Sequence, residues 1–348
     1  MDRESALTSE DGRGATLEAV AREAGVSRAT VSRVVNGSPK VSAEVRREVE
    51  RVVARLGYVP NPAARSLVTR RSDSVGVVIT EPASRLFNDP FFPRLLRGIS
   101  AELSVRNLTL VLLMPSDVGD EVRLERYLAA GHVDGVVLVS LHGADPLPAD
   151  LQARRVPMVV GGRPPDGVSA SYVDVDNREA SRSAVRHLAA LGRRRIATIS
   201  GPVDMGAGID RLEGYRSAIA ELGLGADDRL VAEADFTYEG GAAAMRRLLQ
   251  SAPDLDAVFA ASDLMAAGAL GVLRAAGRRV PEDVALVGFD DSPLAEAMEP
   301  ALTSVRQPIE EMGRELVRLL VESLERPQRA TRRVLLATEL VPRASSGG

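Results

Sequence analysis

A polar run near the N-terminus has the side chains needed to read base edges in DNA. A guanidinium can donate two parallel hydrogen bonds to guanine, and a hydroxyl group can bond a base or a phosphate. Ala29, within the run, offers only a methyl contact. On the outer face of a helix the run would fit the major groove, although the pattern is also typical of a helical hairpin with a solvated, charged face. The polar members of the run are Arg28, Thr30, Ser32 and Arg33.

Two short helices joined by a tight turn are predicted to carry this run. Thr16 and Ser27 can each cap a helix, because a hydroxyl oxygen at that position accepts an unpaired amide of the first turn. Gly25 supplies the left-handed backbone that ends the first helix. Each helix has an apolar stripe at helical spacing, which leaves the polar run outside. The stripes are Leu17, Val20, Ala21 and Ala24, then Val31, Val34 and Val35.

A third helix is predicted from its cap, Ser42, to about Leu56. It ends at Gly57-Tyr58-Val59-Pro60, because proline lacks the amide donor and favours extended backbone in the residue before it. Asn61-Pro62 can start one more short helix that runs toward Arg71. Since one or two helical turns are marginal in water, we expect this segment to be only conditionally helical.

Residues 16 to 67 resemble the DNA-binding region of the LacI–GalR (lactose/galactose repressor) family of bacterial transcription factors. The match is T-L-x-x-V-A-x-x-A-G-V-S-x-x-T-V-S-R-V-V-N, then V-S, R-x-x-V and L-G-Y-x-P-N-x-x-A-R-S-L. The resemblance implies that Arg28 and Ala29 select bases and that Arg33 contacts a base or a phosphate. It also implies that Leu67 wedges into the minor groove, with plain packing as the alternative. Further implied contacts, mostly to the DNA backbone, are Thr16, Ser27, Thr30, Ser32, Asn36, Ser42, Tyr58, Asn61 and Ala64.

Charge is divided unevenly along the chain. Residues 13–71 hold 12 Lys or Arg and 5 Asp or Glu, a net charge of +7, whereas residues 72–348 hold 31 and 39, a net charge of −8. A basic head on an acidic body attracts phosphate at one end only. The chain has no cysteine, which excludes disulfides and thiolate metal sites.

The sequence has no sign of a membrane or export segment. No apolar run approaches the ~18–20 residues of a spanning helix, and the first residues are charged rather than signal-like. We therefore expect a soluble, cytoplasmic protein with no membrane partner. Residues 1–14 and the closing Ala-Ser-Ser-Gly-Gly lack periodicity, so both ends are predicted to be disordered.

From Ser74 onward, apolar strands alternate with amphipathic helices. Repeated β-α units build doubly wound parallel sheets, whose ligands bind at the carboxyl ends of the strands. Two successive sets of strands predict two similar lobes with a cleft between them. The sets are Val75–Ile79, Leu108–Leu113, Gly135–Val139 and Met158–Val160, then Ser171–Val175, Arg195–Ser200, Ala257–Ala260 and Val284–Val287. The helices between them are Phe92–Val105, Glu121–Ala130, Arg178–Leu191, Asp210–Leu222, Gly240–Gln250 and Asp263–Ala276.

This body resembles the family's effector-binding core, which is similar to periplasmic sugar-binding proteins. Pieces of the match are Val133-Asp134-Gly135, Arg211-Leu212-Glu213-Gly214-Tyr215 and Gly288-Phe289-Asp290-Asp291. The implied fold class is an N-terminal all-α helix-turn-helix head plus an α/β two-lobed, periplasmic-binding-protein-like core with two doubly wound parallel sheets and three crossovers between the lobes. The expected division is a lead at 1–14, the head at 15–60, a hinge at 61–73 and the core at 74–348. Within the core we expect an N-lobe at about 74–174 and 304–333 and a C-lobe at about 175–303 and 334–343.

Several residues of the core match the family's ligand contacts. The resemblance implies that Arg211 grips ligand hydroxyl or carboxylate groups, with a surface salt bridge as the alternative, and that Phe236 stacks on the ligand. Asp290 follows an apolar strand, where a carboxylate can accept two sugar hydroxyls. We expect Asp291 and Asp263 to cap helices. The mixture suits a sugar or polyol, and a nucleoside stays open. The predicted ligand contacts are Asn88, Phe91, Arg211, Phe236, Ser262, Asp290 and Gln307.

Motifs of enzymes and cofactor sites are missing from the sequence. Lys40 is the only lysine, so there is no Gly-Lys-Ser/Thr phosphate loop, and no G-x-G-x-x-G or G-x-S-x-G occurs. His132, His142 and His187 lack metal-ligand spacing, and we expect His187 to be structural. We predict no cofactor. A sugar-acting enzyme with a fused DNA-binding head is an alternative; a transport-type binding protein is another, opposed by the basic head and the lack of an export signal.

Together these features predict a homodimer that binds a near-palindromic operator with one head on each half-site. A ligand in the cleft would shift the lobes and change the affinity for the operator. Most relatives are repressors that an inducer sugar releases from DNA, and we expect the ligand to lower operator affinity here as well. A co-repressor, which would raise that affinity, would need the same residues. The chain ends without leucine heptads, so a dimer rather than a tetramer is expected.

Overall fold

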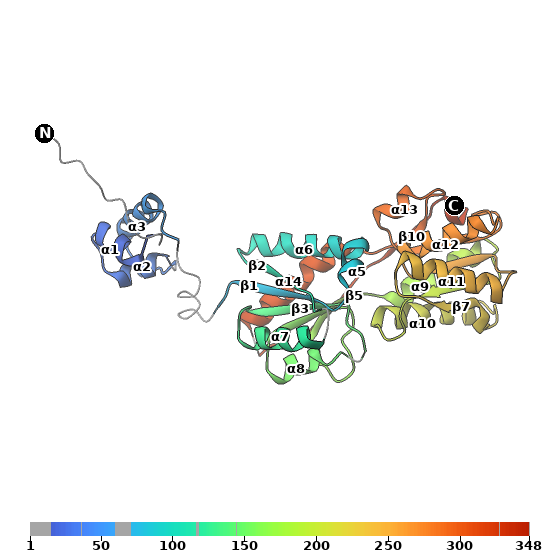
Figure 1. Ribbon diagram of the computed structural model, residues 1–348, viewed down its shortest axis with the longest axis horizontal. Coiled ribbons are helices and arrows are strands. Elements are labelled where there is room, and N and C mark those ends of the chain that lie inside the picture. Colours follow the sequence, from blue (N-terminus) through green and yellow to red (C-terminus); the bar gives the residue numbers. More distant parts are fainter. Residues whose placement is uncertain are drawn as a thin grey trace. The chain divides into compact units, whose positions relative to one another are not determined.

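The computed structural model describes residues 15–35, 37–59, 71–115, 118–143, 145–326 and 328–347. The chain forms two compact units, residues 1–72 and 73–348 (Figure 1). The predicted contacts Asn36, Asn61, Ala64 and Leu67 lie outside the described residues, as do the lead at 1–14 and most of the hinge. Within the described ranges, no helix combines the length and the apolar character needed to cross a membrane.

In the described part of the first unit, three helices surround a small apolar core. Its helices are α1 (Leu17–Glu23), α2 (Arg28–Val35) and α3 (Ala43–Leu56). Each begins at a predicted hydroxyl cap that accepts a first-turn amide at 3.1–3.4 Å; the caps are Thr16, Ser27 and Ser42. Gly25 follows α1 and Gly57 ends α3, both with φ of 62° as the turns require. The buried side chains of this core are Val20, Ala21, Val31 and Val34, from the predicted stripes of the first two helices, and Val49 and Val52 of α3.

The second unit has two lobes, each built on one six-stranded sheet. In the first lobe all strands are parallel, in the order β11-β5-β4-β3-β1-β2. The strands are β1 (Ser74–Ile79), β2 (Thr109–Leu113), β3 (Gly135–Val139), β4 (Met158–Gly161), β5 (Ser171–Val175) and β11 (Arg333–Leu336). The helices are α5 (Ala83–Asn88), α6 (Phe91–Val105), α7 (Val118–Ala129), α8 (Leu147–Ala153) and α14 (Ile309–Glu325).

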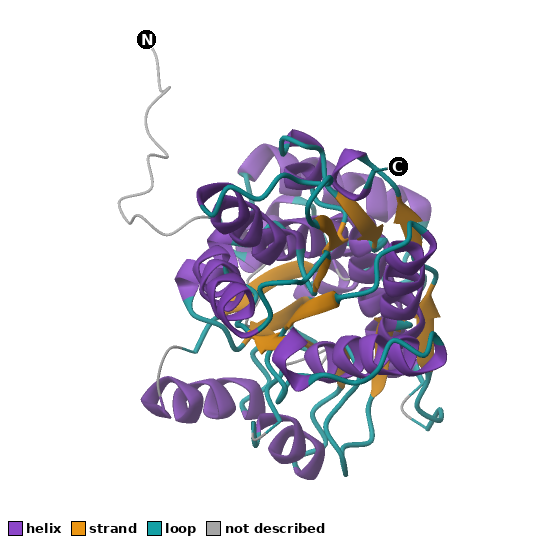
Figure 2. Ribbon diagram, turned by 90° about the vertical axis from the view of Figure 1, so that its right-hand side faces the viewer, coloured by secondary structure: helices purple, strands orange, loops and turns teal. Residues whose placement is uncertain are grey.

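The second lobe repeats this plan in the order β12-β10-β9-β8-β6-β7, with only β12 antiparallel. Its strands are β6 (Ile196–Ser200), β7 (Val231–Glu233), β8 (Ala257–Ala260), β9 (Ala285–Asp290), β10 (Thr303–Arg306) and β12 (Glu339–Val341). Its helices are α9 (Asn177–Ala190), α10 (Gly206–Glu221), α11 (Tyr238–Ser251), α12 (Asp263–Ala275) and α13 (Pro293–Ala297), with short 3-10 turns η1 (Asp228–Leu230) and η2 (Ala344–Ser346). Figure 2 shows the strands in the middle of this unit with helices around them.

The chain crosses between the lobes three times. The first crossing, after β5, lies at the predicted boundary near residue 174, and the other two lie a few residues later than predicted. β5 pairs with β4 in the first sheet, although the sequence grouped it with the second set. β10 lies beside β9, so the first lobe resumes at α14 and not at residue 304. β11 pairs in parallel with β5, so the predicted assignment of 334–343 to the C-lobe holds only for β12. An apolar run does not reveal which sheet it joins, because its partners are distant in sequence.

The last residues are packed against the second lobe, and the prediction of disorder there was wrong. Ser345 and Ser346 are buried. The Ser345 hydroxyl donates to the Leu286 carbonyl oxygen at 2.6 Å, and Ser346 Oγ lies 2.9 Å from His187 Nε2. His187 therefore has the structural role that we expected. Small polar residues look disordered in sequence when their hydrogen-bond partners are distant, as they are here.

Two helices of the first lobe approach each other at backbone distance. α6 precedes the second lobe in the sequence and α14 follows it, so their contact joins distant parts of the chain. A Cβ atom on Gly98 of α6 would lie 2.0 Å from the carbonyl oxygen of Glu310 on α14. In the reverse direction, a Cβ atom on Gly313 would lie 2.4 Å from the Leu95 carbonyl oxygen. Only glycine at both positions permits this separation.

Gly98→Ala is expected to destabilise the core by about 1–3 kcal/mol, because α6 and α14 must move apart to admit the methyl group. Chemical denaturation of the full chain, followed by circular dichroism, measures the loss. Ser100→Ala, on the exposed side of the same helix, is the matched control and should shift the free energy of unfolding by less than about 0.5 kcal/mol. An unchanged midpoint for Gly98→Ala would contradict the close approach.

Candidate functional site

A cavity of about 110 Å³ lies between the two lobes, where several strands of both sheets end. Six of the seven predicted ligand contacts line it: Phe91, Arg211, Phe236, Ser262, Asp290 and Gln307. Asn88 does not; its side chain is exposed at the end of α5 and lines a neighbouring cavity. The topology therefore brings together residues that are scattered over more than half of the sequence.

Arg211, on α10, is the central cation of this site. It is 6 % exposed, so the alternative of a surface salt bridge was wrong. Its Nε donates to Asn177 Oδ1 at 2.8 Å and its Nη1 to the Ala261 carbonyl oxygen at 2.6 Å. The guanidinium carbon lies 3.7 Å from the centroid of the Phe289 ring. Burial lowers the pKa of Arg211, while the surrounding carboxyl groups oppose that shift.

Asp290 ends β9 and faces Arg211 across 3.8 Å, measured from Oδ1 to Nη1. The same oxygen accepts a hydrogen bond from Gln307 Nε2 at 2.6 Å. Its φ of 105° is rare outside glycine, and such outliers gather at functional sites. Burial raises the pKa of Asp290 well above its ordinary value, although the Arg211 guanidinium acts in the opposite direction. The carboxyl group is therefore held by α10 of its own lobe and by the segment that connects β10 to α14.

Carboxyl groups outnumber the free cations around the cavity. Arg85 is paired with Glu81, and Arg163 lies 3.3 Å from Asp210. Asp89 and Asp174 remain, and each is bonded through Oδ1 to a backbone amide. Burial raises the pKa of Asp89, and it raises that of Asp174 to about 6. A further anion would be repelled here, whereas hydroxyl groups can donate to the remaining carboxyl oxygens.

Aromatic rings supply the apolar wall of the cavity. Phe91 and Phe92 meet edge to face with centroids 5.4 Å apart. Phe92 is buried in the core and Phe91 is half-buried toward the cavity. From the second lobe, Phe236 lies against Gly201, where a Cβ atom would come 2.1 Å from the ring. An apolar wall with a few fixed polar groups is the usual construction of a small-molecule site.

Sequence reasoning missed several polar residues that line the cavity or hold its contacts. Asp174 and Asn177 come from the run Val173-Asp174-Val175-Asp176-Asn177, where polar side chains at a strand end could have signalled a site. Arg163 had no such signal, because its partner Asp210 is brought close only by folding. Arg85 has its partner Glu81 four residues earlier, but such a local pair does not by itself indicate a cavity.

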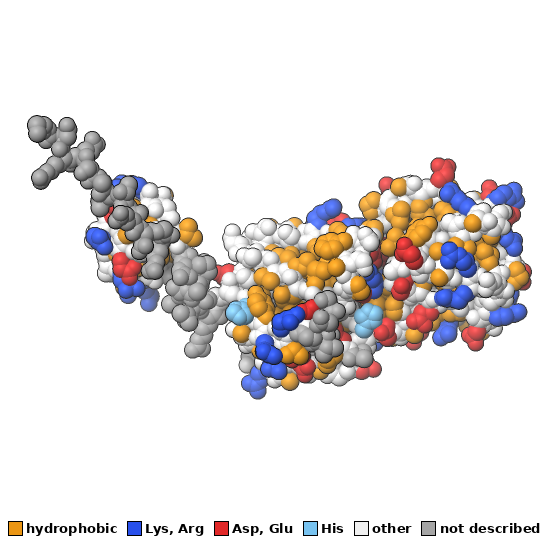
Figure 3. Space-filling view, in the orientation of Figure 1, with side chains coloured by type: hydrophobic (Ala, Val, Ile, Leu, Met, Phe, Trp, Pro, Cys, Tyr) orange, Lys and Arg blue, Asp and Glu red, His pale blue; other side chains and the backbone are white. Residues whose placement is uncertain are grey.

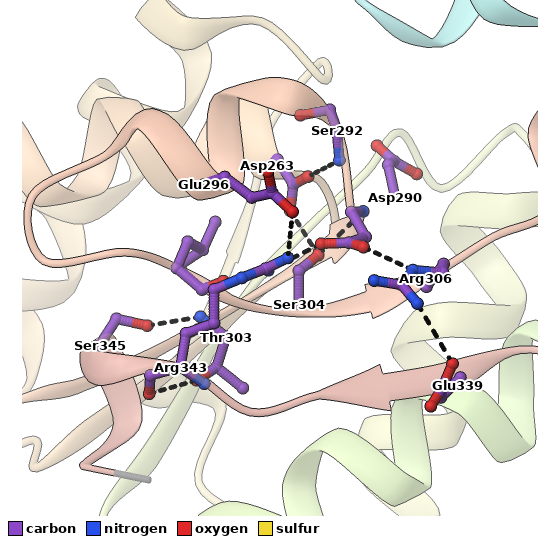
Figure 4. A network of polar contacts seen from close by, with 12 residues as sticks. Asp263, Asp290, Ser292, Glu296, Thr303, Ser304, Arg306, Glu339, Arg343 and Ser345 are labelled. Carbon is purple, nitrogen blue, oxygen red and sulfur yellow. Dashed lines mark hydrogen bonds and ion pairs between the residues drawn. The ribbon is translucent and has the colours of Figure 1, made fainter.

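Asp263 and Asp291 are not the helix caps that we expected. Ser262 caps α12 instead, by accepting the Met265 amide at 3.2 Å. Asp263 accepts the Ser292 amide at 2.7 Å and the Ser304 hydroxyl at 2.6 Å (Figure 4).

Asp291 lies at 2.7 Å from both Arg306 Nε and Arg343 Nη1. Together Asp263 and Asp291 fasten the segment after Asp290 to β10 and to the end of the chain. Both carboxyl groups are therefore used for positioning, which explains why neither is available as a cap.

The outer face of α2 in the first unit carries the predicted DNA contacts. Arg28, Ala29 and Arg33 are exposed, while Thr30 and Ser32 are half-buried. Arg28 Nη1 lies 2.9 Å from Glu18 Oε1, but both side chains are largely exposed, so the pair is weak. Arg28 can therefore leave Glu18 and bind a base at a small cost in free energy. Of the other predicted contacts, Thr16, Ser27 and Ser42 are exposed caps, and Tyr58 packs on the small core.

Comparisons with known protein families agree with this division. The family described as bacterial regulatory proteins, lacI family, matches residues 16–61. The family described as periplasmic binding protein-like domain matches residues 185–346. The two matched regions correspond to the three-helix unit and to the greater part of the second lobe with the returning segments.

The chain is similar over nearly its whole length to transcriptional regulators. It is 53 % identical to the HTH-type transcriptional regulator CelR of Thermobifida fusca over 333 residues, 95 % of this chain and 98 % of that protein. It is 34 % identical to the ribose operon repressor of Escherichia coli (strain K12), covering 95 % of this chain and 100 % of that protein.

Solved structures of regulators have the same architecture. A CelR–cellobiose complex is 51 % identical, with a TM-score of 0.77 over 95 % of this chain and 99 % of that chain. The lac repressor dimer bound to operator and the anti-inducer ONPF is 28 % identical, with a TM-score of 0.84 over 96 % and 99 %. This chain therefore belongs to the LacI family of bacterial regulators, as the resemblance of its helix-turn-helix head predicted, and it is a DNA-binding transcriptional regulator rather than an enzyme.

Proposed function

We propose that this protein is a dimeric repressor whose operator affinity is lowered by an uncharged oligosaccharide bound between its lobes. The observation that carries this proposal is the buried Arg211–Asp290 pair with spare carboxyl oxygens beside an apolar wall. Such a cavity accepts hydroxyl hydrogens and opposes a further negative charge. The solved relative at 51 % identity is a complex with cellobiose, which supports a glucose disaccharide of this kind as effector.

The first lobe has a surface suited to a partner subunit. β2 is the edge strand of its sheet and has half-buried apolar residues along its length. Val105, at the end of the neighbouring α6, is 80 % exposed. In Figure 3 the face over these elements is mostly uncharged, whereas acidic and basic side chains are interspersed over the second lobe. An apolar edge is hidden when a second copy covers it, so we assign the dimer contact to this face. Because a regulator must reach DNA to act, we propose that the protein works in the bacterial cytoplasm.

A direct link connects the ligand-binding segment to the first lobe. Arg94, on α6, donates from Nη1 to the carbonyl oxygens of Asp290 and Asp291 at 3.2 and 3.3 Å. Its Nε and Nη2 bind Glu310 of α14 at 3.0 and 3.2 Å. A ligand that moves Asp290 therefore moves a group bonded to two helices of the other lobe. Through this contact the cleft biases the lobe orientation that permits operator binding.

The whole proposal is tested by selecting an operator from a randomised duplex pool and then titrating effectors against the complex. Fluorescence anisotropy of the selected duplex reports release. Cellobiose is expected to release it, and a nucleoside such as cytidine is not. Failure to enrich any duplex, or release by the nucleoside alone, would refute the proposal.

Asp290→Asn is expected to raise the cellobiose concentration needed for half-maximal release by about tenfold or more, because a buried hydrogen-bond acceptor for a hydroxyl group is lost. The same anisotropy assay measures the change. Operator affinity without sugar reports whether the variant is folded. A half-maximal concentration equal to that of the unmodified protein would remove Asp290 from the ligand contacts.

Arg94→Ala is expected to reduce the sugar-induced loss of operator affinity by about 5-fold or more, because the link between Asp290 and α6 is cut. Sugar binding itself, measured by calorimetry, should persist. Arg97→Ala is the matched control, since Arg97 lies on the same helix, is largely exposed and reaches only 4.0 Å from Glu310. Equal coupling in the two variants would show that the signal takes another route.

Arg28→Ala is expected to relax the base preference at one position of each half-site, at a loss of about 1–3 kcal/mol in discrimination. Sequencing of duplexes selected by the variant measures this. Arg51→Ala removes the same charge from α3 and should weaken binding without changing the preferred bases. If the Arg28 variant selects the same sequences as the unmodified protein, Arg28 does not read a base.

A further inference from the structure

A second cavity of about 620 Å³ adjoins the first between the lobes. We call it the vestibule. It shares Arg85 and Asp89 with the inner cavity, so the two spaces are adjacent. Its other lining residues come from both lobes and are mostly polar; they include Glu81, Ser84, Asn88, His142, Thr237 and Glu239.

The two volumes suggest how a ligand is divided between these spaces. Small-molecule sites usually measure about 300–1,000 Å³. The inner cavity, at about 110 Å³, is below that range, and the vestibule is within it. A ligand with more than one sugar ring therefore needs both spaces, with one ring inside and the next one outside.

Arg85, on α5, lies at the junction of the two spaces. It forms an ion pair with the buried Glu81, which also accepts a hydrogen bond from Ser140 Oγ at 2.6 Å. The guanidinium carbon lies 5.1 Å from the centroid of Phe236 in the opposite lobe. Nε of Arg85 has no acceptor in the described part of the chain. A fixed donor with unused capacity at a passage is suited to an oxygen that joins two rings.

The vestibule also contains groups that can bond sugar hydroxyls. Asn88, which the sequence pointed to as a ligand contact, is exposed there and its amide can both donate and accept. His142 Nδ1 lies 2.9 Å from Asp204 Oδ2 of the second lobe, which holds the two lobes together at this side. The space is therefore bounded by both lobes, as a closing binding site requires.

We propose that the vestibule is a second sugar subsite and that Arg85 holds the glycosidic linkage between the two rings. The protein then distinguishes oligosaccharides from their monosaccharide unit, because only a chain of two or more rings contacts both spaces. This inference rests on the proposed function, which assigns a sugar to the inner cavity.

Ser84→Trp tests the subsite by filling it. Ser84 is an exposed residue of α5 that lines the vestibule and does not line the inner cavity. Ala83→Trp is the matched control, since Ala83 is its exposed neighbour and lines neither space. Calorimetry on the full chain would use glucose, cellobiose and cellotriose. Ser84→Trp is expected to weaken binding of cellobiose and cellotriose by about tenfold or more and to leave glucose within about twofold.

Two results would overturn the subsite. Binding of cellobiose and cellotriose by Ser84→Trp at the strength of the control means that no ring occupies the vestibule. An equal loss for all three sugars means that Ser84→Trp has no effect specific to a second ring, so the vestibule does not distinguish oligosaccharides from glucose. Failure of every sugar to bind the unmodified protein would instead refute the proposed function, and the subsite with it.

Discussion

Burial of one guanidinium constrains the whole cleft. A buried charge costs several kcal/mol unless it is paired and hydrogen-bonded, so Arg211 must find partners. It finds them at three separate points: Asn177 where α9 begins, the Ala261 carbonyl oxygen where β8 ends, and Asp290 where β9 ends. Each point is the carboxyl end of a strand or the start of a helix. The contacts of Arg211 therefore hold these ends at one place, and that arrangement is what a ligand meets.

The three crossings of the chain connect this arrangement in the second lobe to helices of the first lobe. Because α14 returns to the first lobe after β10, it packs on α6 with glycine at the contact. Arg94 and Glu310 lie on these two helices, and Arg94 reaches across to the backbone of Asp290. A protein made of two independent lobes would have no such contact. A movement of Asp290 in the binding pocket can therefore reach α6 and α14 of the first lobe through Arg94.

Sequence reasoning succeeded where the signal is local and failed where the partners are distant. The caps Thr16, Ser27 and Ser42 act within one turn of their own helix, and each was predicted correctly. The grouping of β5 with the second set of strands and the placing of β11 in the C-lobe were wrong, because an apolar strand looks the same in sequence whichever sheet it joins. Asp291 was misread as a cap because its partners, Arg306 and Arg343, come close only in the fold.

The resemblance to the family indicated most of the six residues that line the cavity, and Asp290 was also indicated by its position after an apolar strand. Composition and spacing alone would have left Arg211 an ordinary surface arginine, since nothing near it in sequence predicts its burial. Arg85 was not predicted as a residue of the cavity. Phe236 lies in the other lobe and approaches Arg85 only in the fold. Glu81 is four residues away, and such a local ion pair does not by itself indicate a cavity. An uncharged effector adds no charge to the protein, and exposed charges are screened within about 8 Å at physiological ionic strength. The effect that we propose for it on the first lobe therefore travels through packed contacts such as that of Arg94.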